Sequence, residues 1–274
     1  LENYTPPLED NTLDLSLHAL RVEIMQLAKA SQNIELYAEI ALDGRPSKEM
    51  PAYSIKIAEL YLKSGQAEKA LEYLPDFNAP AWNASGDRVR LQALESLGRK
   101  DEANAKRLKN VAKYPSSYTV SEYLKNLDAT ETETAKERLR TVILESSISP
   151  ITRAEALIEL GDTADAAEMI CQNAAAVKEE SYYAQSDLAK KLDAQEPVAA
   201  TILYRGAVEQ TLAEAKPKNY RYAVSYLKKL QKLEVLIQDW QGQEAHASWW
   251  TQTHAKHALK TSLTRELKKA GIQN

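Results

Sequence analysis

The stretch from Ile55 to Leu74 constrains the fold more than any other part of the chain. Ala58 and Tyr61 lie at helical spacing, and the apolar pattern restarts after Gly65, a position typical of a left-handed helix C-cap. Two short helices that face each other across this glycine satisfy the pattern. A small residue on each arm, Ala58 and Ala70, predicts a close approach of the two backbones.

This spacing resembles the tetratricopeptide repeat, whose units are pairs of short helices. The matching positions are held by Ile57, Ala58, Tyr61, Gly65, Ala70 and Leu74. Ser54 stands where that family usually has Trp, so the unit departs from the consensus. The resemblance implies a right-handed α-α superhelix, a solenoid that binds a partner and does not itself carry out catalysis.

Two further copies of the pattern follow. They are carried by Leu91, Leu94, Gly98, Ala103 and Pro115, and by Ala154, Leu157, Gly161, Ala166 and Ile170. The first two glycines of the series are 33 residues apart, close to the family period of about 34. Arg90 and Arg107 fall where apolar residues are expected. We therefore expect Val89 and Leu108 to take over that packing.

Helical patterns fill the rest of the chain. A helix is predicted from Thr12 onward, with an apolar stripe at Leu13, Leu17, Leu20, Ile24 and Leu27, and a second one covers 34–42. An irregular hairpin is expected at 118–127 and 130–145, the latter opening with a capping box from Thr130 to Glu133. After Glu179 the helices lengthen, and 197–233 reads as two of them joined at Lys216-Pro217.

The C-terminal block resembles part of a family of uncharacterised bacterial helical proteins and, more distantly, the helical tail of bacterial SWIM-type zinc-finger proteins. The residues that carry this resemblance are Ala199, Ala200, Leu203, Tyr204, Arg205, Tyr220, Ala223, Tyr226 and Leu227. The zinc-binding motif of the SWIM proteins is absent from the sequence. We predict an all-α protein with a helical hairpin at 1–50, tetratricopeptide-like repeats at 51–195 and a module of longer helices at 196–274.

Composition agrees with a soluble, cytoplasmic protein: 44% of residues are hydrophobic and 27% are charged. No apolar run approaches the roughly 20 residues that cross a bilayer, so no membrane partner is expected. Gly is scarce, with 8 in 274 residues, and strand-like segments are missing. Cys171 is the only cysteine, which rules out an intramolecular disulfide, and its apolar neighbours predict a small buried side chain.

No motif in the sequence indicates an enzyme. Glycine-rich phosphate loops, the GxSxG elbow and the HExxH helix are all missing. The histidines His254 and His257 share a helix face, but His246 lies about 16 Å away along a continuous helix, too far to complete one metal site. We therefore expect no catalytic residue, no cofactor and no metal, and partly exposed histidines beside Trp250.

A protein or peptide partner is the expected ligand. In the tetratricopeptide family the first helix of each pair lines the concave groove, and the resemblance places there Ala52, Ile55 and Glu59, followed by Arg88, Gln92 and Glu95. Family members that capture a C-terminal carboxylate use Lys and Asn at the positions of Ile55 and Glu59. Their absence implies an internal or basic peptide segment, or a helix, as the ligand.

A nucleic acid is the alternative partner. From Lys216 onward, 11 Lys and Arg stand against 4 Asp and Glu, a net charge of +7, which leaves −11 for residues 1–215. A basic and aromatic face on the last helix is predicted from Trp250, His254, His257, Lys256, Lys260 and Lys268. The competing interpretation is a terminal helix that packs through Trp249, Leu259, Leu263 and Leu267 while its lysines stay in solvent. Arg205, among apolar residues, is expected to make a structural ion pair or carbonyl contact, with ligand contact as the alternative.

Overall fold

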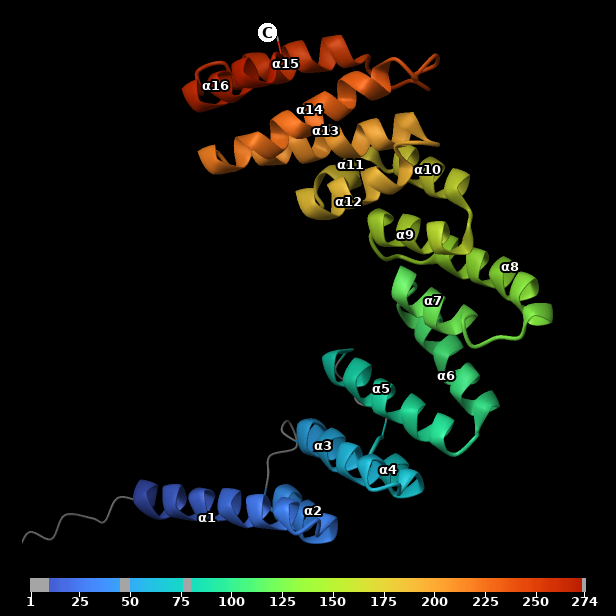
Figure 1. Cartoon of the computed structure of the whole chain (residues 1–274), viewed down its shortest axis with the longest axis vertical. Coiled ribbons are helices and arrows are strands. Elements are labelled where there is room, and N and C mark those ends of the chain that lie inside the picture. Colours follow the sequence, from blue (N-terminus) through green and yellow to red (C-terminus); the bar gives the residue numbers. More distant parts are fainter. Residues whose placement is uncertain (1–9, 45–49, 76–79, 273–274) are drawn as a thin grey trace, which may run out of the picture. The chain divides into compact units, whose positions relative to one another are not determined.

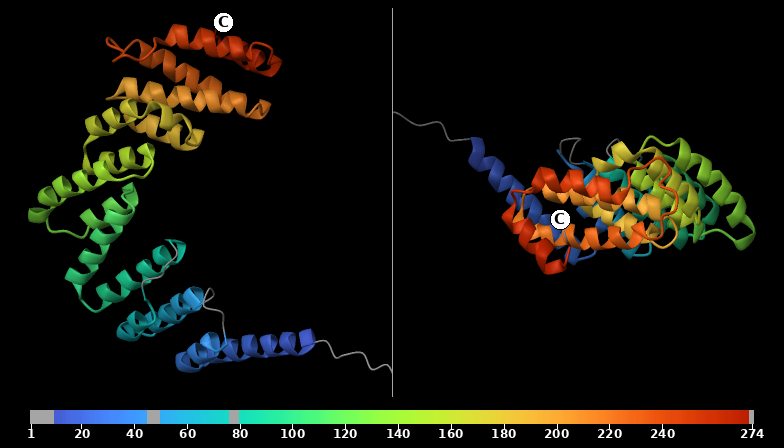
Figure 2. Two further views of the ribbon diagram at one scale, coloured as in Figure 1. Left: turned by 180° about the vertical axis from the view of Figure 1, so that it is seen from behind. Right: turned by 90° about the horizontal axis from the view of Figure 1, so that it is seen from above.

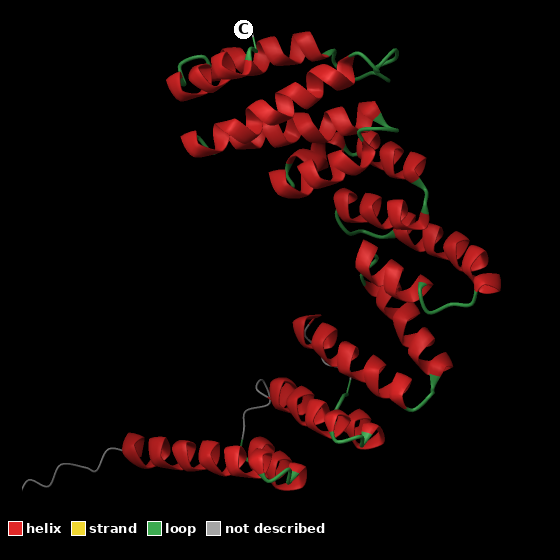
Figure 3. Cartoon of the chain, viewed as in Figure 1, coloured by secondary structure: helices red, strands yellow, loops and turns green. Residues whose placement is uncertain are grey.

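The computed structural model describes residues 10–44, 50–75 and 80–272, with side chains from residue 17 in the first range and from residue 84 in the third. These residues form 16 α-helices and one short 3₁₀ helix, and no strand occurs among them (Figures 1 and 3). The all-α prediction is confirmed. No helix in the described ranges is both long and apolar enough to cross a membrane.

Contacts between Cα atoms divide the chain into two compact units, 1–106 and 107–274, which are described separately below. The three-part division expected from the sequence and the right-handed superhelix stay predictions.

Unit 1 consists of helices that pair with their neighbours along the chain. They are α1 (Asp10–Ala30), α2 (Ile34–Leu42), α3 (Met50–Lys63), α4 (Ala67–Glu72), α5 (Pro80–Ser96) and the first half of α6 (Lys100–Lys113). α1 packs on α2 and α3 on α4, while α2 and α5 each pack on α3. The α3 helix therefore lies at the centre of this unit.

The predicted hairpin around Gly65 is confirmed as α3 and α4. Gly65 has a φ of +79°, the left-handed conformation in which a side chain would be strained. The N–H of Gln66 donates to the Tyr61 carbonyl at 2.9 Å and closes the C-terminus of α3. Ala58 and Ala70 are completely buried, as the close-approach argument requires.

The second copy, α5 and α6, differs from the expectation at one position. Val89 and Ala103 are fully buried, but Leu108 is exposed and Arg107 is buried in its place. Ala103 and Arg107 are four residues apart on one face of α6, and each further residue turns the helix by about 100°. Leu108 consequently points away from the buried side, so the prediction that it replaces Arg107 in the packing is wrong.

The apolar stripe of α1 also differs from the prediction. Leu17, Leu20 and Leu27 are exposed, whereas Met25 and Ala28 are buried in a cluster with residues of α2 and α3. The side chain of Leu13 lies outside the described residues. The sequence period correctly predicted a helix, but the helix turns a different face toward α2.

Unit 2 is built around α13. Its helices are the second half of α6, α7 (Ser117–Leu124), α8 (Ala129–Glu145), α9 (Pro150–Leu160), α10 (Thr163–Gln172), α11 (Ala174–Lys178), α12 (Tyr182–Leu192), α13 (Pro197–Ala213), α14 (Tyr220–Glu234), α15 (His246–His257) and α16 (Thr261–Ala270), with a 3₁₀ turn at Pro217–Asn219. α13 packs on α10, α11, α12 and α14, and Figure 2 shows it between α12 and α14. Every residue from Val198 to Val208 is buried.

The helices predicted between 118 and 233 are found in unit 2, with one change at a helix start. The third copy forms α9 and α10, with Gly161 at a φ of +93° and with Leu157 and Ile170 fully buried. α8 begins after Asp128 without a side-chain cap, so the capping box predicted at Thr130 is wrong. A capping box occurs instead at Ser116 before α7.

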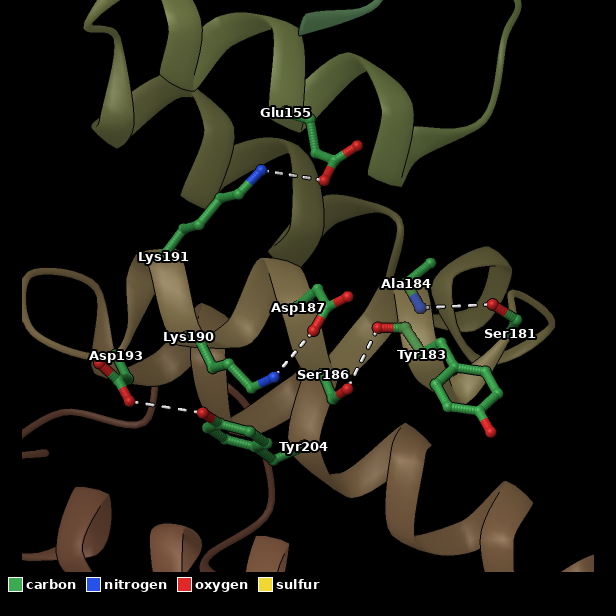
Figure 4. Close-up of polar contacts among 10 residues, drawn as sticks. All are labelled: Glu155, Ser181, Tyr183, Ala184, Ser186, Asp187, Lys190, Lys191, Asp193 and Tyr204. Atoms are coloured by element: carbon green, nitrogen blue, oxygen red, sulfur yellow. Dashed lines mark hydrogen bonds and ion pairs between the residues drawn. The ribbon is translucent and has the colours of Figure 1, made fainter. Parts of the chain in front are cut away.

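The contact between α12 and α13 is very close. A Cβ atom placed on Gly206 of α13 would overlap Oε1 of Gln185, which is completely buried on α12. Polar contacts surround this interface (Figure 4): the Tyr204 hydroxyl donates to Asp193 at 3.4 Å, and Lys191 pairs with Glu155 of α9 at 3.1 Å. Burial, followed by the charge of Asp193, raises the pKa of Tyr204.

Candidate functional site

The residues predicted to line a groove in unit 1 are partly brought together. Nη2 of Arg88 on α5 lies 2.8 Å from Glu59 on α3, and Lys56 lies 3.3 Å from the other carboxylate oxygen. Burial opposes ionisation of Glu59, but the hydrogen bonds from Arg88 and Lys56 outweigh it and lower its pKa. Glu59 is therefore an ionised carboxylate that joins two successive helix pairs.

Arg88, Gln92 and Glu95 are exposed and recur every three to four residues of α5, so they lie on one helix face. Ile55 does not belong to this surface, because it is buried in the apolar cluster of unit 1. Since α2 and α5 both pack on α3, the exposed face of α3 is narrower than the repeat resemblance implies. The surface formed by Glu59, Arg88, Gln92 and Glu95 is called the α3–α5 surface below.

Two adjoining hollows lie beside this surface, between α3 and the α1–α2 pair. Their volumes are about 260 Å³ and about 190 Å³, and both are lined by Lys29 and Tyr37. Lys56 lines the first and Lys63 the second. We call the two together the lysine groove. Sequence analysis missed it, and the available signal was a lysine in the last turn of both α1 and α3.

The predicted basic face at the C-terminus is divided between two helices. α15 ends at His257 and α16 begins at Thr261, so the expected single stripe does not exist. Trp250 and His254 are neighbours on α15, with ring centroids 5.3 Å apart, while Lys268 lies on α16. Lys256 and Lys268 are exposed. The competing packing interpretation is also wrong at Leu259, which is 97% exposed in the turn between the helices.

Lys260 has a structural contact. Its ammonium group donates to the carbonyl of Leu212 near the C-terminus of α13 and lies 5.9 Å from the centre of the Tyr220 ring. A cation at a helix C-terminus is favoured by the unpaired carbonyl groups there. This lysine connects α13 to the α15–α16 turn.

Arg205 holds the segment that links α14 to α15. Its guanidinium group lies 5.1 Å from the ring centres of both Trp240 and Trp249, and its Nη1 donates to the Glu244 carbonyl at 2.7 Å. Burial lowers its pKa, although Glu244, Glu209 and Glu234 act in the opposite direction. The carbonyl contact expected from the sequence is present.

That linking segment forms one wall of a cleft of about 500 Å³ against α10 and the start of α13. Three carboxylates line it, Glu168, Glu196 and Asp239, and no Lys, Arg or His does. We call it the acidic cleft. Cys171, which is half-buried there rather than fully buried as expected, has its pKa raised by burial and then by Glu196 and Glu168.

No group of three or more His, Cys, Asp or Glu residues in the described part of the chain is arranged to hold a metal ion. His246 is buried, stacks at 5.6 Å on Trp249 and has its pKa lowered by burial. His246 is therefore buried, whereas His254 and His257 are partly exposed and lie further along the chain.

Comparison with known proteins places the chain in a family. The model of a family of unknown function, DUF6880, matches residues 12–265. The chain belongs to the DUF6880 family. No tetratricopeptide or SWIM-type family model matches this DUF6880 protein. No curated protein and no solved structure matches the chain.

Proposed function

We propose that this DUF6880 protein is a non-enzymatic, cytoplasmic scaffold that binds a protein or peptide through the α3–α5 surface. The observation that carries the proposal is the Glu59–Arg88 ion pair, which connects successive helix pairs where further polar side chains are exposed. Partners of helical-repeat proteins bind on such surfaces made by neighbouring repeats.

The chemistry of the α3–α5 surface supports a polar partner. Arg88 is 55% exposed and uses only Nη2 in its bond with Glu59, so its Nε and Nη1 donors are available to a carbonyl or carboxylate. Gln92 adds both a donor and an acceptor. Together these groups match the alternating donors and acceptors of a peptide backbone.

The test is a paired binding measurement with a partner purified by pull-down. The Arg88→Ala/Gln92→Ala variant is expected to bind at least about tenfold more weakly, because contact residues carry most of the binding energy. The variant Lys256→Gln/Lys268→Gln serves as control and is expected to bind as the parent does. The proposal fails if the two variants behave in the opposite way at unchanged melting temperature.

Nucleic-acid binding through unit 2 is the second candidate, favoured by exposed cations on α14 that the predicted basic face did not include. Arg221, Lys228 and Lys232 are exposed on α14, and Arg265 and Lys268 are exposed on α16, which packs on α14. Phosphate contacts give a steep loss of affinity with salt. A salt titration with a single-stranded oligonucleotide decides this candidate, since a flat titration excludes it.

A further inference from the structure

The lysine groove combines three cations with an apolar floor. Lys29, Lys56 and Lys63 line it, together with Tyr37, Tyr53 and Val22, and no Asp or Glu among the described residues does. The contrast with its surroundings is large, since residues 1–106 contain 12 Lys and Arg against 17 Asp and Glu, a net charge of −5. The groove is therefore a basic site within an acidic unit.

Two of these lysines lack partners. Lys29 and Lys63 are exposed, and neither forms an ion pair or a side-chain hydrogen bond with a described residue. Lys56 is 3.3 Å from Glu59, but Glu59 is shared with Arg88. The C-terminal ends of α1 and α3 contribute roughly half a negative charge each, less than the three lysines supply. The field in the groove remains positive.

The groove is divided into two hollows. Each hollow, at about 260 Å³ and about 190 Å³, is smaller than a usual small-molecule pocket of about 300–1,000 Å³, and the two together fall within that range. Each has room for an amino-acid side chain. An apolar side chain fits between Val22 and the two tyrosines, while neighbouring carboxylates reach the lysines.

We propose that the lysine groove binds an acidic peptide segment that carries an aromatic or branched aliphatic side chain between its carboxylates. This inference rests on the proposed scaffold function and names the chemistry of the partner. It differs from the expectation of an internal or basic peptide segment, or a helix, which rested on the absence of Lys and Asn at the positions of Ile55 and Glu59. A long polyanion fits less well, because the rest of unit 1 is acidic and repels it.

The test measures fluorescence anisotropy of labelled dodecapeptides with the full chain at low salt. The three probes have a central Phe-Leu pair flanked by Glu, by Gln or by Lys. We expect the Glu peptide to bind at least about fivefold more tightly than the Gln peptide, and the Lys peptide to bind most weakly. Equal binding of the three peptides would overturn the inference.

Two matched variants locate the effect. Lys29→Gln/Lys63→Gln is expected to abolish the preference for Glu over Gln, at unchanged melting temperature. Lys100→Gln/Lys125→Gln removes the same net charge from exposed sites elsewhere and is expected to preserve it. The inference is wrong if both variants lose the preference equally, or if an oligothymidine competes as strongly as the Glu peptide.

The outcome is separable from that of the proposed function. If the three peptides bind alike while the purified partner still loses affinity for Arg88→Ala/Gln92→Ala, the scaffold proposal stands and the acidic-ligand inference fails. If binding of the Glu peptide requires the two lysines but the affinity of the partner is unchanged in Arg88→Ala/Gln92→Ala, the lysine groove replaces the α3–α5 surface as the binding site.

Discussion

The lysine groove of unit 1 and the acidic cleft of unit 2 have opposite chemistry in one chain. The first is lined by three lysines without a carboxylate, and the second by Glu168, Glu196 and Asp239 without a cation. Because an ion pair forms only when opposite charges meet within about 4 Å, linings of one sign leave charge available to a ligand.

The two units also differ in what lies behind these surfaces. Unit 1 pairs charged side chains at the surface, for example Lys69 with Glu35 at 2.8 Å, and its buried Asp87 is paired with Lys106 at 2.7 Å. Unit 2 buries polar groups in its interior, among them Arg205, Gln185 and His246. Buried polar groups are costly unless they are satisfied, so unit 2 is expected to respond more strongly than unit 1 to substitution and to pH.

The largest effect is expected at Arg205. The change Arg205→Ala removes the cation between Trp240 and Trp249 and the bond to the Glu244 carbonyl, and should cost about 3 kcal/mol of unfolding free energy. Tryptophan fluorescence during denaturant unfolding measures it, since three of the four Trp are in unit 2. The change Arg88→Ala, at an exposed cation of unit 1, should stay within about 0.5 kcal/mol. Equal losses of unfolding free energy for the two variants would contradict the expectation that unit 2 is more sensitive to substitution than unit 1.

A second comparison tests the contact between α12 and α13 in unit 2 by adding a methyl group to it. Gly206→Ala places a methyl group against the buried Gln185 amide and should cost about 2–3 kcal/mol. Gly271→Ala is the control. A Cβ at this position meets no atom within 4 Å, so the only cost is the backbone strain of an alanine at a φ of +72°. Denaturant midpoints that rank the two the other way would show that α12 and α13 separate easily.

The corresponding change in unit 1 is Ala70→Leu. Ala70 is fully buried at the α3–α4 contact, so the larger side chain should cost about 1–3 kcal/mol. Lys63→Ala on the same hairpin is expected to be nearly neutral, because this side chain is exposed. Circular dichroism melts test both. If Lys63→Ala proved the more damaging, the hairpin registration around Gly65 would be wrong.

The smallest effect concerns pH. Burial, assisted by Arg205 and opposed by Glu234, lowers the pKa of His246 below its ordinary value of 6.5. As the pH falls below about 6.5, the unfolded chain binds a proton at this position before the folded chain does, so the free energy of unfolding decreases. His246→Gln should flatten this dependence between pH 7.5 and 5.5, measured by denaturant midpoints.

Local features of the sequence determined the helices and their pairing. The apolar period defines a helix wherever it recurs, and Gly65, Gly98 and Gly161 each adopt the positive φ that ends the first helix of a pair. The small residues Ala58 and Ala70 marked a close contact in the same local way. Such signals depend on neighbours within a few residues, so they can be read without knowledge of the fold.

The tertiary structure decided which faces are covered and which groups remain free. Ile55 is buried because α2 and α5 both flank α3, and Lys260 is committed to the carbonyl of Leu212, 48 residues earlier. Arg205 donates to the carbonyl of Glu244, which lies 39 residues later in the chain. Lys29 and Lys63, on different helices, line the same hollow. The helical period of the sequence gives the direction in which a side chain points from the axis of its helix. Only the packing of distant helices determines whether that direction leads to a core, a partner or solvent.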